Sequence, residues 1–203
     1  MHTIINVGRS FGSGGGFVGQ AIAKKLDIPF YDNELISQAC EENGYSKDLF
    51  AGGEKKRSIF SASSFFTSGR ISSLDGSYVN DDILFKAQSE VIRAIAEKGD
   101  AVIIGRCADY ILRDLPCLNV FICGPEEYRI KRLMENEGLT ADEAEKLMRR
   151  KDRTRETYYN YYTFGAWGQA ANYDLCMDSS VLGIEGTADF IIDFGRRAGK
   201  IGR

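Results

Sequence analysis

The sequence is poor in residues that bind metals and in apolar runs long enough to cross a membrane. Its 203 residues include one histidine, His2, and five cysteines that form no C-x-x-C pair. A structural zinc site needs four such ligands at close spacing, so we predict no metal-ligating cluster. No apolar stretch approaches the roughly 20 residues of a transmembrane helix, and we find no signal-peptide pattern. We therefore expect a cytoplasmic protein with reduced thiols and no membrane partner.

An excess of positive charge is also missing. Lys and Arg together number 26, and Asp and Glu number 29, which gives a formal net charge of −3. Proteins that bind nucleic acid are normally basic, so we predict no nucleic-acid partner, while a local anion pocket stays compatible with this balance. The length and the apolar fraction of 43% suit one globular domain over residues 1–203.

Short apolar strands and amphipathic helices alternate along most of the chain. The strands are expected at 3–8, 28–32, 101–105, 118–124 and 173–180. Helical patterns occupy 15–26, 33–43, 81–98, 125–138, the residues after 140 and the residues after 184. This alternation predicts an α/β fold, a parallel sheet of about five strands with helices on both faces. We expect the last nine residues to be a solvated tail.

Residues 45–80 break this alternation. The stretch is rich in Ser and Gly, and it contains a basic cluster at 55–57 and a lone Arg70. Phenylalanines at 60, 65 and 66 make it unlike a plain flexible linker. We interpret it as a small insertion that covers a substrate, with Arg70 as a candidate substrate-binding residue. A disordered surface loop is the alternative.

A glycine-rich turn joins the first strand to the first helix. The stretch "VGRSFGSGGGFVG" at 7–19 has six glycines, more than a tight turn requires. Free N–H groups and the positive end of the helix dipole point at such a turn, so it predicts a phosphate site. The candidate phosphate-binding residues are Gly12, Ser13, Gly14, Gly15 and Gly16. A Walker loop, G-x-x-x-x-G-K-[ST], would place its lysine where this chain has Gly15.

The loop taken alone also fits a dinucleotide-binding enzyme. Gly8, Gly12 and Gly14 spell G-x-x-x-G-x-G, a pattern of short-chain dehydrogenases that bind NAD(P), and Asp32 could bind a ribose. Those enzymes need a Tyr-x-x-x-Lys pair for proton transfer. No tyrosine of this chain has a lysine four residues later. We keep the dehydrogenase as the weaker alternative.

Several later segments share their order and spacing with one family. They are "GSGG", "IPFYDNELI", "IIGRCADYIL", "VFICGPEEYRIKR", "DRTRETYYNYYTFGAWG" and "YDLCMDSSVLG". With these segments the chain resembles the cytidylate kinase-like family, a divergent branch of the nucleoside monophosphate kinases. The resemblance covers nearly the whole chain and implies a P-loop NTPase-type fold, ATP and Mg²⁺ as cofactors, and a small nucleotide substrate. It also implies that the lysine-free loop is a family trait.

The resemblance implies the residues that bind the acceptor. Arg106 matches the arginine of a Gly-Arg-Asp element that contacts the monophosphate, and Asp109 is the candidate for its missing aspartate. Arg132 matches an arginine of the helix after the fourth strand, although a helix ion pair with Glu135 is an equal alternative. Asp32 ends the second strand and is expected to face the phosphate crevice.

The segment "RRKDRTR" at 149–155 holds five cations around Asp152. So many like charges repel one another unless anions or solvent intervene. The resemblance implies an arginine-rich lid at about 149–165 that closes on the phosphates, with the aspartate holding one of its arginines. The candidate catalytic residues are Arg150, Asp152, Arg153 and Arg155. A solvated run of charge is the alternative, and the tyrosines that follow favour a packed lid or a homo-oligomer contact.

We therefore expect a phosphotransferase that moves the γ-phosphoryl group of ATP to a nucleoside monophosphate, with CMP first among the acceptors. Ser13 and Ser10 are equally placed to help hold Mg²⁺. A nucleotide-binding or regulatory protein with weak catalysis is the alternative, because Gly15 cannot supply a cation to the phosphates.

Overall fold

The computed structural model describes residues 2–45 and 77–202. Arg70 and nearly all of the insertion expected at 45–80 lie outside the described residues. The end of that stretch belongs to a helix, α3 (Ser77–Lys98), which begins four residues before the helical pattern expected from 81.

Five parallel strands form the sheet, in the order β2-β3-β1-β4-β5. Their bounds are β1 (Ile4–Arg9), β2 (Phe30–Tyr31), β3 (Ala101–Ile104), β4 (Leu118–Cys123) and β5 (Leu175–Asp178). Val7 of the central strand β1 pairs with Ile104 on one side and Val120 on the other. β1 lies where the strand order reverses, with β2 and β3 on one side and β4 and β5 on the other. Open α/β sheets bind ligands outside the carboxyl ends of the strands at such a point.

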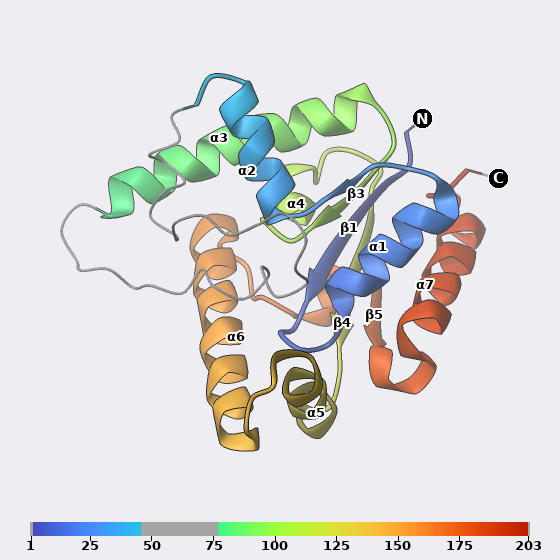
Figure 1. Cartoon of the computed structure of the whole chain (residues 1–203). Coiled ribbons are helices and arrows are strands. Elements are labelled where there is room, and N and C mark those ends of the chain that lie inside the picture. The colour runs from blue at the N-terminus through green and yellow to red at the C-terminus, as the bar shows by residue number, and fades with distance from the viewer. Residues whose placement is uncertain (1, 46–76, 203) are drawn as a thin grey trace.

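Helices cover both faces of the sheet, as predicted (Figure 1). One face carries α1 (Gly15–Leu26) and α7 (Ser179–Arg197), and the other carries α3 with α2 (Asn33–Glu42) and the short α4 (Ala108–Ile111). A pair of helices, α5 (Glu126–Glu137) and α6 (Ala141–Thr163), packs together near the carboxyl ends of the strands, and a 3₁₀ turn (Ala170–Asn172) leads into β5.

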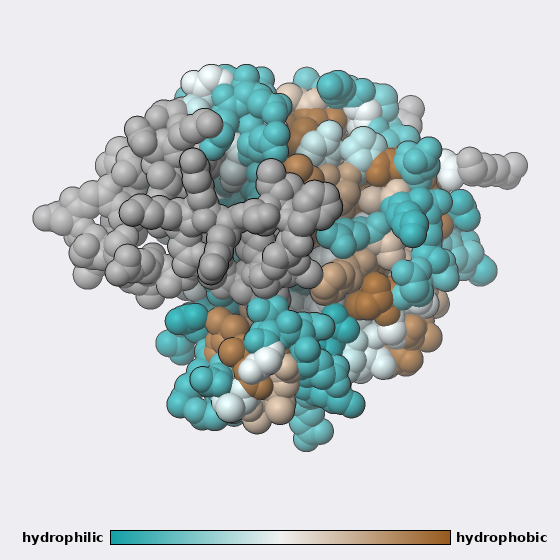
Figure 2. All heavy atoms as spheres, viewed as in Figure 1, coloured by the Kyte–Doolittle hydropathy of each residue, from teal (hydrophilic) through white to brown (hydrophobic). Residues whose placement is uncertain are grey.

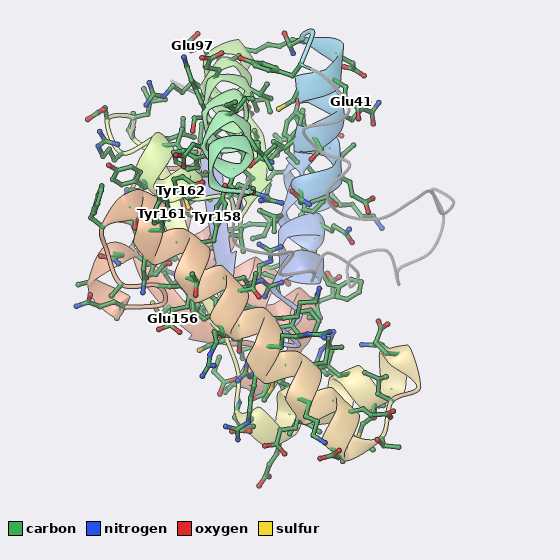
Figure 3. The ribbon with its side chains drawn as sticks, turned by 90° about the vertical axis from the view of Figure 1, so that its left-hand side faces the viewer. Glu41, Glu97, Glu156, Tyr158, Tyr161 and Tyr162 are labelled. Atoms are coloured by element: carbon green, nitrogen blue, oxygen red, sulfur yellow. The ribbon has the colours of Figure 1, made fainter. Side chains whose placement is uncertain are left out.

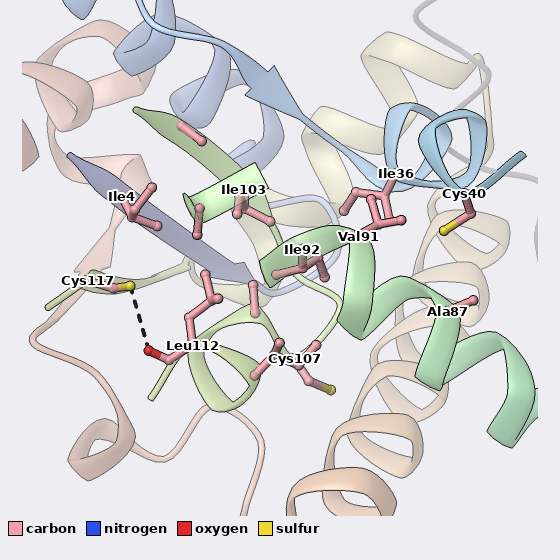
Figure 4. Packing of buried hydrophobic residues seen from close by; sticks show 14 of the residues in the cluster. Ile4, Ile36, Cys40, Ala87, Val91, Ile92, Ile103, Cys107, Leu112 and Cys117 are labelled. Atoms are coloured by element: carbon pink, nitrogen blue, oxygen red, sulfur yellow. Dashed lines mark hydrogen bonds between the residues drawn. The ribbon is translucent and has the colours of Figure 1, made fainter. Parts of the chain in front are cut away.

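Each face of the sheet has its own apolar core, because successive strand residues point to opposite faces. Ile5 and Val7 of β1 join Val18 and Ile22 of α1 in one cluster. Ile4 belongs to the second cluster, with side chains of α2, α3 and α4 (Figure 4). The two layers bury the first four residues of β1 at the centre of the sheet.

The α5–α6 pair is built from strong local signals. Gly138 ends α5 in the left-handed conformation, with φ at 67°. Thr140 opens α6 with a complete capping box, in which its side chain and that of Glu143 satisfy each other's backbone N–H groups. Leu133 and Met148 then bury Phe11, the middle residue of the glycine turn, between the two helices. The turn is therefore anchored by its own side chain.

The C-terminal tail only partly matches the expectation of a solvated end, since residues 196–199 are exposed but Ile201 is not. Ile201 is 6% exposed and packs on the α1–α7 side of the core. Lys200 Nζ lies 2.7 Å from both carboxylate oxygens of Asp174, and Asn119 N donates to the same carboxylate at 2.8 Å. Asp174 thus ties the tail to the start of β4. Apolar burial and this ion pair, neither visible in a short polar segment, order the tail.

Three of the five cysteines, Cys40, Cys107 and Cys117, are buried among apolar side chains, and none of the five is in a disulfide. In the part of the chain that the structure describes, no helix is long and apolar enough to cross a membrane.

Candidate active site

The glycine turn places backbone N–H groups at the carboxyl end of β1. Gly12 and Gly14 have φ of 79° and 80°, a conformation that favours glycine. A Cβ on Gly12 would lie 3.0 Å from the Arg129 carbonyl oxygen, so the turn also needs glycine for close packing. The first N–H groups of α1 have no acceptor within the helix and face the turn. This arrangement is a ready site for an anion.

A small pocket opens at this turn. Its lining comes from the end of β1, the glycine turn, the N-terminal part of α1, and α5 and α6. The lining residues are Arg9, Ser10, Phe11, Gly12, Gly14, Gly15, Gly16, Phe17, Gln20, Arg132, Leu133, Asn136 and Arg155. On the face shown in Figure 2, apolar residues gather near the start of α1 among largely hydrophilic surroundings. The pocket thus combines apolar walls with N–H groups and three arginines.

Asp152 of α6 binds the turn directly. Its carboxylate accepts the Phe11 N–H at 2.6 Å and the Arg129 guanidinium at 2.5 Å. Arg129 also donates to the Phe11 carbonyl oxygen at 3.1 Å. The expected partner of Asp152 was a lid arginine, but the ion pair is made with α5. Asp152 is therefore a positioning residue for the turn, because both of its oxygens already have donors.

Arg155 and Arg132 reach the pocket from different helices. Arg155 Nη1 donates to the Arg9 carbonyl oxygen at 3.2 Å, and its guanidinium lies over the Phe11 ring, 5.2 Å from the centroid. Arg132 Nη2 lies 3.2 Å from where a Cβ on Gly14 would be. Both cations therefore stand beside the turn, where phosphate charge would be neutralised.

Arg9, which sequence reasoning did not select, also lines this pocket. It is the last residue of β1, so a charged residue closing an apolar strand was the available signal. Burial lowers the pKa of Arg9 well below its usual range, and the nearby cations of Arg155 and Arg106 lower it further. Burial likewise lowers the pKa of Arg155 to about 10. Arg9, Arg106 and Arg155 therefore lie close enough together to repel one another.

Arg106 lies on the α3 side of this arginine group. Gly105, Arg106 and Cys107 all have positive φ, at 67°, 55° and 56°, which is costly for the two residues with side chains. The guanidinium of Arg106 lies over the Tyr158 ring, 5.5 Å from its centroid. The strained turn after β3 therefore aims this cation at α6.

The tyrosines of α6 pack within the chain. Figure 3 shows Tyr158, Tyr161 and Tyr162 where α6 meets α3. Tyr162 stacks on Phe85 with centroids 4.0 Å apart, and the Tyr158 hydroxyl donates to Gln88 Oε1 at 3.3 Å. The end of α6 is thus docked on α3, and a lid function of this segment remains a prediction. Tyr161 stays 54% exposed, and the homo-oligomer contact remains a prediction.

The two acidic candidates have local partners. Asp32 caps α2, since its Oδ1 accepts the N–H groups of Glu34 and Leu35 at 3.0 Å each, and its charge also acts on Arg9. Asp109 accepts the Tyr159 hydroxyl at 2.7 Å. Asp32 therefore lies at the arginine group, whereas the contact of Asp109 is with a buried tyrosine of α6.

The remaining candidates lie away from the pocket. Arg150 and Arg153 are exposed on α6, and Arg149 pairs with Glu126 and Glu145 on the surface. These arginines match the solvated alternative. The Ser13 hydroxyl is buried and donates to the Ser10 carbonyl oxygen at 2.8 Å, whereas Ser10 lines the pocket.

Comparison with known proteins gives the family. Residues 4–181 match the model of the cytidylate kinase-like family. The chain belongs to this family. The resemblance seen in the sequence is confirmed, and family and fold together support a phosphotransferase. None of the curated proteins compared with the chain matches it.

Solved structures share the fold of this chain. An uncharacterized protein from Eubacterium ventriosum is 29% identical, with a TM-score of 0.76, and 97% of this chain covers 99% of that one. The shikimate kinase from Bacteroides thetaiotaomicron is 14% identical, with a TM-score of 0.56 and coverage of 97% and 99%. The shikimate kinase from Acinetobacter baumannii is 13% identical, with a TM-score of 0.54 and coverage of 100% and 96%. The two kinases show the fold alone.

The strand order speaks against the dehydrogenase alternative. In the dinucleotide-binding fold the first strand neighbours the second, in the order 3-2-1-4-5-6. Here β1 neighbours β3 and β4. The glycine pattern alone could not distinguish the two folds because both place glycines between the first strand and the first helix.

Removal of the Asp152 carboxylate should destabilise the turn. We expect Asp152→Ala to lower the free energy of unfolding by roughly 2–3 kcal/mol, because the Phe11 N–H and the Arg129 cation lose their acceptor. The matched control is Asp142→Ala on the same helix, whose carboxylate forms an exposed ion pair with Lys146. The control should cost no more than about 0.5 kcal/mol. Urea unfolding measures both losses, and equal losses would contradict this role.

Asp109 should make stability depend on pH. Burial raises the pKa of Asp109, and the hydrogen bond from Tyr159 offsets only part of the rise. A carboxyl group with a raised folded-state pKa stabilises the fold at low pH and loses this contribution as pH rises through that pKa. We expect the melting temperature of the wild type to fall relative to Asp109→Asn between about pH 3.5 and pH 7. Scanning fluorimetry measures the difference, and a growing wild-type advantage would exclude this explanation.

Proposed function

We propose that the protein transfers the γ-phosphoryl group of ATP to a nucleoside monophosphate, with CMP as the first candidate acceptor. The observation that carries this proposal is the group of arginines around the glycine turn. Phosphoryl transfer needs positive charge, N–H donors and in-line placement rather than a covalent intermediate. The family and the fold support the same class of reaction.

The pocket at the turn suits the polyphosphate of ATP. The N–H groups of the turn and of the first turn of α1 would bind phosphate oxygens, and Arg132 and Arg155 would add charge from the sides. The exposed Phe17 of the lining gives the rest of the nucleotide an apolar surface. Arg155 is held at the end of β1 by its hydrogen bond to the Arg9 carbonyl oxygen.

We expect the acceptor to bind on the α3 side, beside Arg106. Its phosphate would bind Arg106, and an oxygen of that phosphate would attack the γ-phosphorus. The bond from the γ-phosphorus to the bridging oxygen would break, giving ADP and a nucleoside diphosphate. Because a phosphate oxygen is already anionic, this step needs no general base. Asp152 and Asp109 are therefore free to act as structural partners.

The residues present fit Mg²⁺ only as a companion of the phosphates. Among the described residues, no group of three or more His, Cys, Asp or Glu side chains is placed to bind a metal. Mg²⁺ is commonly held by one or two protein oxygens, water and substrate phosphates. Ser10 and Asp32 are the nearby candidates, and the metal would neutralise charge on the transferred group.

A transfer assay tests the proposal. The protein is incubated with γ-labelled ATP, Mg²⁺ and each of the nucleoside monophosphates, and shikimate is included because the fold is shared with shikimate kinases. We expect label in a nucleoside diphosphate, most of it with CMP. ATP binding without transfer to any acceptor would instead favour the nucleotide-binding alternative.

Two arginines of α6 test whether the segment at 149–155 contributes one specific cation to the site or only a general positive charge. Arg155→Ala should lower turnover by roughly 100-fold or more, because a preorganised cation at the transferred group is lost. Arg153→Ala, two residues away and exposed, should keep most of the turnover. Steady-state kinetics of the two folded variants measures this contrast. Equal losses of turnover in the two variants, or no loss in Arg155→Ala, would contradict the role of Arg155 in the site.

A further inference from the structure

Arg9 projects under the first turn of α1. Strand residues alternate between faces, so Arg9 follows Ile5 and Val7, which pack against α1. At the end of β1 this face meets the glycine turn instead of the apolar core. The aliphatic part of Arg9 therefore occupies the space between the strand and the helix N-terminus.

Arg9 fills the position that a Walker lysine would need. A Cβ on Gly15 would lie 2.6 Å from Arg9 Cβ and 3.1 Å from Ile122 Cβ. Real Cβ atoms do not approach a carbon atom as closely as the first of these distances. The absence of lysine is thus a packing requirement of this loop, because β1 supplies the side chain at that place.

From this position Arg9 reaches across the edge of the sheet. A Cβ on Gly105, at the end of β3, would collide with Arg9 Nη1. Arg9 also lines the pocket together with Gly14 and Gly16. The side chain therefore runs along the floor of the phosphate site, from the glycine turn toward Arg106.

The charge of Arg9 is not neutralised within the described residues. The ion pairs made by arginines there involve Arg129, Arg149 and Arg197, and none joins Arg9 to a carboxylate. Arg155 and Arg106 repel it, and the attraction of Asp32 is the weakest of the four influences on it. Held cations without a nearby anion favour the binding of one.

We propose that Arg9 is the cation of the phosphate loop: its guanidinium binds the polyphosphate of ATP, in the place of the lysine that Walker loops carry on the first turn of the helix. This assignment rests on the proposed function, because it presumes a nucleotide at the turn. In a Walker loop the lysine of the helix supplies the positive charge at the phosphates. Here a strand residue beneath the loop would supply that charge, and the loop itself would supply N–H groups.

Calorimetric binding of MgATP and of pyrophosphate tests the assignment. Arg9→Met, of similar length and without charge, should bind both roughly 10- to 100-fold more weakly than the wild type. The matched control is Arg197→Met, which removes an exposed arginine of α7 paired with Asp193 and should bind like the wild type. Equal affinity of Arg9→Met and wild type would overturn the assignment while leaving the proposed function intact. Failure of the wild type to bind either ligand would overturn both.

Thermal stability distinguishes binding from a structural role. Without ligand, Arg9→Met should melt at a higher temperature than the wild type, because it relieves repulsion among three arginines. With pyrophosphate, it should gain less than the wild type does. A lower ligand-free melting temperature with an unchanged gain would show that Arg9 only supports the fold.

A measurement on the wild type covers the case in which Arg9→Met does not fold. The arginine Nε–H signal that disappears in the spectrum of Arg9→Lys belongs to Arg9. In the ¹⁵N-labelled wild type this signal should shift when pyrophosphate is added. An unshifted signal, with other signals of the turn responding, would overturn the assignment.

Rebuilding the Walker residue provides the opposite test. Gly15→Lys should lower the melting temperature and weaken pyrophosphate binding, because the Cβ of the new lysine would displace the Arg9 side chain. A damaged Walker loop would instead bind more tightly with the lysine restored. Tighter binding by Gly15→Lys would therefore overturn the assignment.

Discussion

The Asp152 carboxylate holds together three segments that are far apart in the sequence. It accepts the Phe11 N–H of the glycine turn and the Arg129 cation of α5, and it belongs to α6 itself. The side chains of Arg129 and Asp152 are only 14% and 20% exposed, so water cannot readily replace either partner. The turn, α5 and α6 are thereby coupled. The position of Arg155, one helical turn further along α6, follows from this tie.

A second constraint is the crowding of positive charge next to that tie. Arg9, Arg106 and Arg155 approach one another from β1, the turn after β3 and α6, and burial and mutual repulsion lower the pKa of Arg9. Repulsion within this group raises the free energy of the ligand-free protein. A bound anion would relieve that repulsion. Stability and phosphate binding are therefore linked through the same side chains. The positive φ of Arg106 is a further cost to stability that comes with placing this cation in the arginine group.

Local patterns predicted most of the fold because strands and helices repeat their apolar residues with fixed periods. The capping box at Thr140 and the parallel strands were predicted on this basis and are present. Most of the tail is exposed as expected, but Ile201 is buried, because its burial depends on the distant β4 and α7. Within the site, composition identified the arginine-rich segment, but it could not distinguish Arg155 from Arg153 on opposite sides of one helix.

The sequence by itself determined the elements, their order, the glycine turn and the family, since these depend on residues close together or on motifs in series. Only the tertiary structure decided which charges meet at the turn. Arg9 was hidden because its significance comes from Gly15, Gly105 and Arg155, which belong to three other segments. The absence of a lysine from the glycine turn can be read from the sequence. The side chain that fills its place is visible only after β1 and α1 have packed, because steric exclusion acts between atoms that the chain brings together by folding.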